Sequence, residues 1–208
     1  MKNSKKKNPE TIRRNRQLLI NALSTCVIVI ILFTIFDFAK DIMTDASAYE
    51  LRYEESEIYP QEGKQYTMYV DGRFYGRVDH NKFCLQDEDG NTDYRYCVLM
   101  EDATRFTYVL IFAAMMFCVL GIARESVETT PFTAHNIKLV KVISIFQLSL
   151  CVLPGLVRSL MSFLRFNYSS STFDEKSIYM LVIGAIIAMI AVVFERGLTL
   201  QEDMDSIA

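Results

Sequence analysis

Four polar residues alternate along one acidic segment in a pattern typical of calcium-binding loops: Asp87, Asp89, Asn91 and Asp93. Carboxylate and amide oxygens are ligands that Ca²⁺ prefers in proteins. The segment departs from a calcium loop because its glycine, Gly90, stands too early and no bidentate glutamate follows at the end of the loop. We therefore interpret these residues as a solvated polar turn rather than a metal site.

The motifs of familiar enzymes are absent from the sequence. There is no phosphate-binding G-x-x-x-x-G-K-[ST], no dinucleotide-binding G-x-G-x-x-G, no G-x-S-x-G nucleophile turn and no zinc-binding H-E-x-x-H. The two histidines, His80 and His135, lie on opposite sides of the uncharged stretch 106–123 and are not expected to share a site. We expect no enzyme, no catalytic residue, no cofactor and no metal.

Two of the five cysteines are placed to react with each other. Cys84 and Cys97 flank a predicted hairpin turn on a segment that we expect in an oxidising compartment. A disulfide between them is predicted, and closing so short a loop would add about 3 kcal/mol to stability. Cys26, Cys118 and Cys151 fall inside apolar stretches and are interpreted as small apolar residues.

Four uncharged stretches are the main feature of the chain, and the elements that they form must hold the residues named above in place. They cover 17–36, 106–123, 142–157 and 177–194. A helix of this length reaches roughly 24 to 30 Å, which is close to the thickness of the bilayer core. Four buried helices of a soluble protein are the alternative, but 26–32 and 181–193 are apolar on every face. The sequence predicts an all-α integral membrane four-helix bundle.

The longest charged segment separates the first two predicted helices and predicts a small β-rich insert. Two apolar runs flank Asp71-Gly72, a strong hairpin signal, and a second hairpin is predicted from 83–85 and 94–98. The expected layout, in chain order, is a basic amino terminus, helix, insert, helix, turn, helix, loop, helix and acidic tail: 1–16, 17–39, 41–104, 106–123, 124–137, 138–164, 165–176, 177–195 and 196–208.

Basic residues before the first helix predict the orientation of the chain. Seven lysines and arginines precede residue 17, opposed only by Glu10, which favours a cytoplasmic amino terminus. Four crossings then return the carboxyl terminus to the cytoplasm. The small residues at 46–48 resemble a signal-peptidase site but lie too far beyond the apolar run, so an uncleaved anchor is favoured. The basic residues are interpreted as a contact with anionic lipid, without direct nucleic-acid binding.

The polar and small residues inside the predicted helices can each be interpreted in two ways. Gln147 is the best candidate for a substrate path, although amides of this kind also hold helices together. Gly184, Ala185 and Ala188 pack helices either within the bundle or between copies, so a homo-oligomer stays open. Asp37 and Arg158 close the outer ends of their helices, and an interfacial ion pair between them is predicted.

Two segments at the predicted cytoplasmic face resemble a bacterial family of four-pass membrane proteins, catalogued as domain of unknown function 2975. The turn at 130–138 fits the pattern T-P-F-x-x-x-N, and the tail from Gly197 fits G-x-x-L-Q-E-x-x-D. The resemblance implies the same succession of helix, insert and three helices. It also implies partners among small cytosolic helix-turn-helix regulators and supplies no catalytic residue.

These motif residues define a candidate docking surface: Phe132, Asn136, Gly197, Leu200, Gln201, Glu202, Asp203 and Asp205. In the alternative interpretation Thr133 caps the third helix, Gly197 ends the fourth, and the tail is merely solvated. We expect a non-enzymatic sensor or regulator of the bacterial inner membrane that docks a cytosolic DNA-binding regulator. A small transporter or permease accessory subunit is the alternative function.

Overall fold

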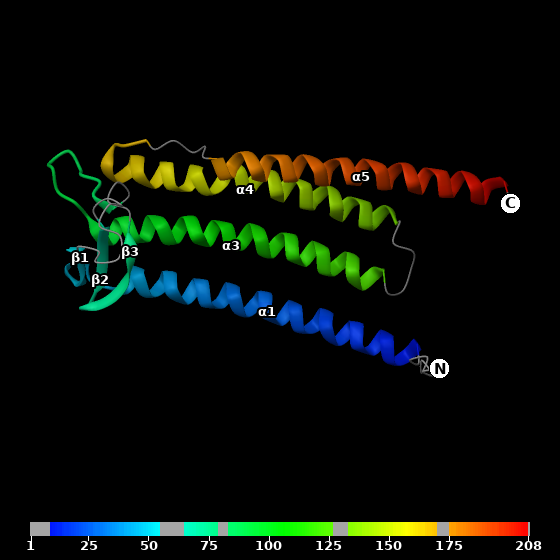
Figure 1. Cartoon of the computed structure of the whole chain (residues 1–208), viewed down its shortest axis with the longest axis horizontal. Helices are drawn as coiled ribbons and strands as arrows, with labels where there is room; N and C mark the ends of the chain where they lie inside the picture. Colours follow the sequence, from blue (N-terminus) through cyan, green and yellow to red (C-terminus); the bar gives the residue numbers. More distant parts are fainter. Residues whose placement is uncertain (1–8, 55–64, 79–82, 127–132, 170–174, 208) are drawn as a thin grey trace. The chain divides into compact units, whose positions relative to one another are not determined.

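Four long apolar helices pack together, with a small three-stranded antiparallel sheet between the first and the second of them in sequence (Figure 1). The computed structural model describes residues 9–54, 65–78, 83–126, 133–169 and 175–207. The predicted fold class, a four-helix bundle with a β-rich insert, is confirmed.

The helices are α1 (Pro9–Met43), α3 (Tyr94–Glu125), α4 (Ala134–Phe166) and α5 (Glu175–Ile207). Each has 32 to 35 residues and is therefore longer than the roughly 20 residues that a bilayer core needs. Only 11% to 33% of the most apolar stretch of each helix is buried inside the protein. Because the remaining apolar surface needs a nonaqueous neighbour, the chain is a membrane protein with four helices that can span a bilayer.

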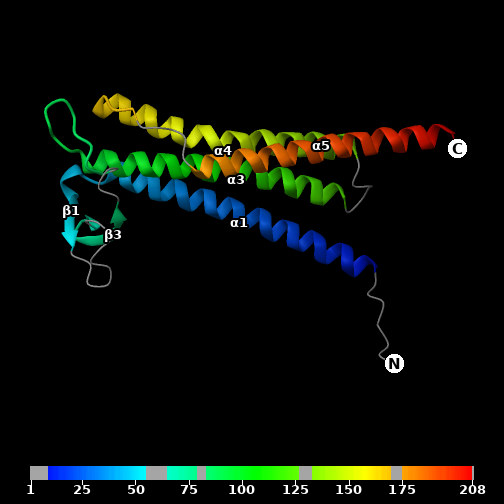
Figure 2. The same ribbon diagram turned by 45° about the horizontal axis from the view of Figure 1, so that its top comes forward.

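The chain divides into two compact units. The sheet unit comprises 34–107 and 153–172, and the helical unit comprises 1–33, 108–152 and 173–208. Helices α1, α3 and α4, each drawn as one helix in Figure 2, contribute residues to both units. In α4 the division falls beside Pro154, which stands inside the helix.

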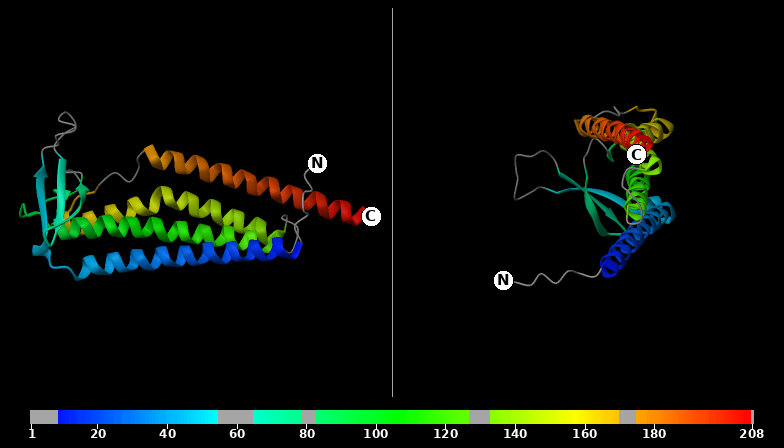
Figure 3. Two further views of the ribbon diagram at one scale, coloured as in Figure 1. Left: turned by 60° about the horizontal axis from the view of Figure 1, so that its bottom comes forward. Right: turned by 90° about the vertical axis from the view of Figure 1, so that its right-hand side faces the viewer.

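The sheet has the order β1-β2-β3, formed by Tyr49–Glu54, Gln65–Val70 and Arg73–Val78 (Figure 3). Strands β2 and β3 form the hairpin predicted around Asp71-Gly72. Both turn residues have positive φ, 51° and 71°, as the two-residue turns that match strand twist require. The edge strand β1 was not predicted, although 49–54 alternates apolar and polar side chains.

The second predicted hairpin is wrong, because residues 94–98 form the first turns of α3. Asp93 caps this helix: its Oδ1 accepts a hydrogen bond from the Tyr96 N–H at 2.9 Å. Within the described residues, the preceding turn keeps only an isolated bridge between Gln86 and Thr92. The helix cap thus outweighs the strand preference of the aromatic and β-branched residues that follow.

The core of the sheet unit joins the sheet to the ends of α3 and α4. Its buried residues are Tyr49, Met68, Phe83, Cys97, Val98 and Phe166. The rings of Tyr96 and Phe166 meet edge to face, with centroids 5.7 Å apart. The predicted disulfide is also absent: Cys84 and Cys97 are both free thiols. Cys97 lies on a helix rather than on a strand facing Cys84, so the geometry that suggested the pair does not form.

Two predicted segment boundaries are also revised. Helix α1 already begins at Pro9, within the predicted basic segment 1–16. Helix α5 continues to Ile207, so the predicted tail 196–208 is helical over its described residues and Gly197 does not end the helix.

Candidate functional site

The sheet unit holds two buried carboxyl groups, Asp41 on α1 and Asp102 on α3. They expose only 7% and 5% of their surface. The two carboxyl groups lie within hydrogen-bonding reach of each other. Burying charged oxygens costs several kcal/mol per group unless donors or counter-ions compensate. The groups around these aspartates therefore decide what the pair can do.

Two tyrosines of the sheet donate to this aspartate pair. The Tyr49 hydroxyl, from β1, lies 3.2 Å from Asp41 Oδ1 and 3.3 Å from the Asp41 carbonyl oxygen. The Tyr75 hydroxyl, from β3, donates to Asp102 Oδ1 at 3.4 Å. Strands β1 and β3 are therefore each bonded to a different helix through a tyrosine and an aspartate.

Two arginines of α3 complete the cluster. Arg105 Nη1 lies 3.6 Å from Asp102 Oδ1, although most of its side chain is exposed. Arg95 donates to the backbone carbonyl of Ile42, one residue after Asp41. The carbonyl that accepts this bond is close to the end of α1, where backbone oxygens lack helical donors.

The electrostatics of the cluster hold both tyrosine hydroxyls in their protonated form. Burial and the neighbouring Asp41 carboxyl raise the pKa of Tyr49 from 10.0 to about 12. Burial, followed by the carboxyl groups of Asp102 and Asp41, also raises the pKa of Tyr75. Both hydroxyls are therefore donors at neutral pH, which is what the aspartate oxygens require.

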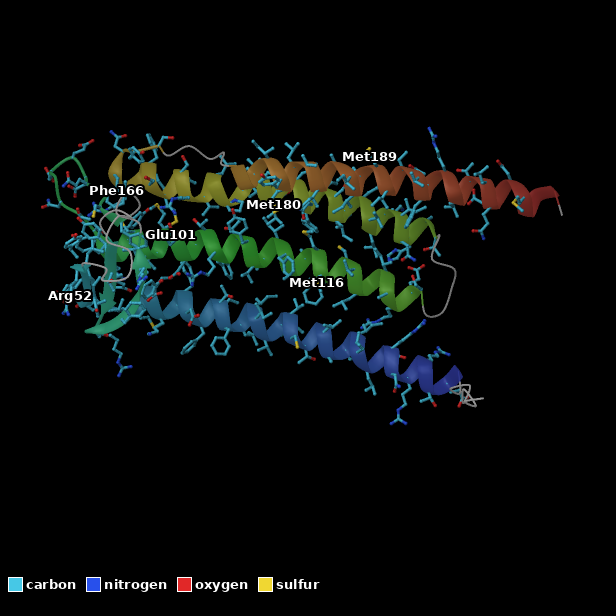
Figure 4. All side chains as sticks on the ribbon, in the orientation of Figure 1. Arg52, Glu101, Met116, Phe166, Met180 and Met189 are labelled. Atoms are coloured by element: carbon cyan, nitrogen blue, oxygen red, sulfur yellow. The ribbon has the colours of Figure 1, made fainter. Side chains whose placement is uncertain are left out.

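A second polar contact in the sheet unit corrects a predicted pair. Arg158 of α4 forms an ion pair with Glu101 of α3, not with Asp37. Glu101 projects from α3 in Figure 4, and Asp37 is exposed on α1. The predicted partner was wrong because α3 starts well before residue 106 and brings Glu101 into the helix.

The acidic turn that resembles a calcium loop is closed by the chain itself. Asp87 Oδ1 accepts the backbone N–H groups of Asp89 and Asn91 at 3.1 and 2.8 Å. Arg165 lies 3.9 Å from Asp87 Oδ2 and 3.4 Å from Asp93 Oδ2. These donors and this cation already occupy the carboxylates. The interpretation as a polar turn is consistent with this arrangement.

The predicted docking residues lie in the helical unit, on α4 and α5. Asn136 is buried in the first turn of α4, whereas Gln201, Glu202 and Asp203 are exposed on α5. Lys141 Nζ lies 2.9 Å from Glu195 Oε1 and sets the register between these antiparallel helices. Counting back from this pair places Asn136 level with about residue 200, one helical turn from Gly197. Phe132 lies outside the described residues, as does the side chain of Asp205.

The turn before α4 has the predicted cap. Thr133 Oγ1 accepts the N–H of Asn136 at 3.1 Å and donates to Glu125 Oε1 at 2.9 Å. His135 Nε2 lies 3.8 Å from Glu125 Oε2. Glu125 therefore contacts both Thr133 and His135 at the start of α4, which sequence spacing alone did not reveal.

Gln147 is a packing residue in the structure. Its side chain is buried and Nε2 donates to the sulfur of Met180 at 3.2 Å. Met180 lies on α5, as Figure 4 shows. Gly184 of α5 packs against Leu148 of the same chain. These contacts favour the reading in which polar and small residues hold α4 and α5 together. They give no support to a substrate path at Gln147.

No family model matches this sequence, and neither curated proteins nor solved structures give a match. The family resemblance of the two motifs therefore stays a prediction. Among the described residues, histidine, cysteine, aspartate and glutamate form no group of three or more that could hold a metal ion.

Sequence reasoning missed the aspartate cluster altogether. Asp41 and Asp102 are far apart in sequence and stood in a segment read as a solvated insert. The sequence did contain a signal, because Asp41 follows the first uncharged stretch and Asp102 precedes the second. Each therefore lies in the charged flank of an apolar helix. Carboxylates at adjacent ends of packed helices are candidates for burial next to each other.

Proposed function

We propose that this chain is a non-enzymatic regulator of the bacterial inner membrane that docks a soluble, basic protein through the carboxyl-terminal end of α5. The observation that carries this proposal is the length of α5. From the Lys141–Glu195 pair, α4 has seven more residues back to Ala134, whereas α5 has twelve more to Ile207. The difference of five residues corresponds to about 7.5 Å of helix beyond the start of α4.

The surface chemistry of this helix end suits a protein partner. Leu200 and Met204 are one turn apart on the same face and expose 65% and 72% of their surface. Glu202 and Asp203 are exposed beside them. An apolar stripe bordered by carboxylates fits an apolar groove with a basic rim, the usual arrangement for helix-in-groove recognition.

The type of partner follows from charge and from the family resemblance. Proteins that bind DNA carry basic surfaces, which are complementary to the carboxylates of α5. The resemblance implies small helix-turn-helix regulators as partners. The basic residues before residue 17 favour a cytoplasmic amino terminus, and after four crossings the end of α5 would lie in the cytoplasm as well. A change in helix packing would sequester or release the regulator.

Site-specific photo-crosslinking in living cells tests this proposal. A photoreactive residue at position 204 should form an adduct with a soluble DNA-binding protein, identified by mass spectrometry. The matched control is position 189 on the same helix, where Met189 is exposed within the uncharged stretch 177–194 and should contact lipid only. Leu200→Ala should weaken the adduct at 204. Equal protein adducts at both positions, or none at 204, would overturn the proposal.

A further inference from the structure

One oxygen of the buried pair Asp41 and Asp102 has no hydrogen-bond donor within the part of the chain that the structure describes. Asp41 and Asp102 are both more than nine-tenths buried and within hydrogen-bonding reach. Asp102 Oδ2 is fully buried and receives no donor from any described residue. An ionised carboxylate only accepts hydrogen bonds. Two ionised carboxylates in contact would therefore repel each other and would leave this buried oxygen without a hydrogen.

Most donors around the pair bond to other atoms, and the buried Nε of Arg95 has no acceptor among the described residues. Tyr49 donates to Asp41 Oδ1 and Tyr75 donates to Asp102 Oδ1. Arg105 approaches Asp102 on that same Oδ1, and Arg95 donates to the carbonyl of Ile42. Among the residues that the structure describes, these four side chains, from β1, β3 and α3, are the titratable or charged groups that lie against the pair. None of these contacts supplies a hydrogen to Asp102 Oδ2.

We propose that Asp41 and Asp102 form a proton-binding site in which one carboxyl group is protonated and donates to the other. The ligand is the proton itself, and this inference goes beyond the proposed docking function and does not depend on it. Close carboxyl pairs in proteins share a proton for the same reason, since two like charges at that separation cannot both persist.

Occupancy of this site controls how the sheet is held on the helices. With one proton, the pair carries a single charge and both tyrosines keep well-placed acceptors. When the pH rises and the proton leaves, two buried carboxylates repel each other across the contact between α1 and α3. The hydrogen bonds from Tyr49 and Tyr75 then connect the sheet to two helices that move apart. The sheet unit should therefore be tightest at low pH and loosen as the pair ionises.

Infrared spectroscopy of the full-length protein in lipid bilayers tests the proton site. The wild-type protein at neutral pH should show the carbonyl stretch of one protonated carboxyl group, and this band should disappear as pH rises. Asp41→Asn and Asp102→Asn should each abolish the band, because the remaining carboxylate then accepts a hydrogen from the asparagine amide. Asp37→Asn, on an exposed residue of α1, is the matched control and should leave the band unchanged.

A second measurement keeps the test valid if a variant folds poorly. Proteolysis of the wild-type sheet unit should accelerate as pH rises through the loss of the band, and the rate for Asp102→Asn should be independent of pH. A wild-type spectrum without the band would overturn the proposal. Removal of the band by sodium or potassium ions at fixed pH would also overturn it, because the pair would then be a cation site.

Discussion

Arg158 of α4 forms an ion pair with Glu101 of α3, and the two side chains expose only 16% and 27% of their surface. Both residues belong to the sheet unit. The pair therefore joins the parts of α3 and α4 that carry the core around Phe166. Shielded from water, its attraction is screened less than that of a surface pair.

We expect Arg158→Leu to lower the free energy of unfolding by about 1 to 3 kcal/mol, because the Glu101 carboxylate loses its cation while it stays partly buried. Thermal unfolding in detergent measures this change. Glu50→Gln is the control, since it breaks the exposed Glu50–Arg52 pair and should leave the free energy of unfolding nearly unchanged. Equal shifts for both variants would contradict the assigned role of the Arg158–Glu101 pair.

The Tyr49 hydroxyl predicts a dependence of stability on alkaline pH. Because the pKa of Tyr49 is about 12 in the folded protein and 10.0 ordinarily, the folded state keeps this proton more firmly than the unfolded chain. The resulting stabilisation is complete below pH 10.0 and is lost as pH rises through about 12. We expect Tyr49→Phe to remove this part of the pH dependence and to cost about 1 kcal/mol at neutral pH.

Absorbance of the tyrosinate form and thermal unfolding, both followed against pH, check this expectation. Tyr53→Phe on the same strand is the control, since Tyr53 is exposed. The wild-type curve should exceed that of Tyr49→Phe at neutral pH and converge with it at the alkaline end. A constant difference between the two curves would show that Asp41 and burial do not hold the Tyr49 proton.

The hydropathy of continuous stretches and one turn motif were sufficient to predict most of the fold. The uncharged stretches locate the four helices, since a run of about 18 apolar residues is typical of a membrane-spanning helix. Asp71-Gly72 locates the hairpin, because positive φ at both positions suits these two residues. Both signals are local, and no tertiary contact competes with them.

The errors arise where tertiary contacts or a cap decide between two local options. Residues 94–98 have strand-forming side chains, yet the Asp93 cap and burial of Cys97 and Val98 make them helical. The same change moves Glu101 onto a helix and gives Arg158 an unexpected partner. The Asp41–Asp102 pair could not be predicted because it depends on which helix ends meet, and sequence spacing carries no such information.

The hydroxyl of Thr133 caps α4, which predicts a specific cost for its removal. Thr133→Ala removes the hydroxyl that accepts the Asn136 N–H and that donates to Glu125 Oε1. We expect a loss of about 1 kcal/mol in the free energy of unfolding, measured by thermal unfolding in detergent. Thr133→Ser keeps the oxygen and should restore most of the stability. A serine variant as unstable as the alanine variant would point to the methyl group instead of the cap.

The contact between Gly184 of α5 and Leu148 of α4 predicts which substitutions the helical unit tolerates. A Cβ at position 184 would lie 2.9 Å from Leu148 Cδ2 and 3.0 Å from Cγ, which is closer than carbon atoms normally approach. Small residues allow helices to pack at such short range in membranes. We expect Gly184→Val to cost about 1 to 3 kcal/mol through overpacking, measured by thermal unfolding in detergent.

Gly121 of α3 provides the matched control for this contact. There, a Cβ would meet only the far end of the Leu139 side chain, at 3.2 Å, and that end can move by a few tenths of an ångström. Gly121→Ala should therefore be neutral or stabilising, because alanine favours helix by about 1 kcal/mol over glycine. Leu148→Ala combined with Gly184→Val should recover part of the lost stability, since the smaller side chain leaves room for the valine. If the two substitutions were instead additive, the loss at Gly184 would have to come from a contact other than Leu148.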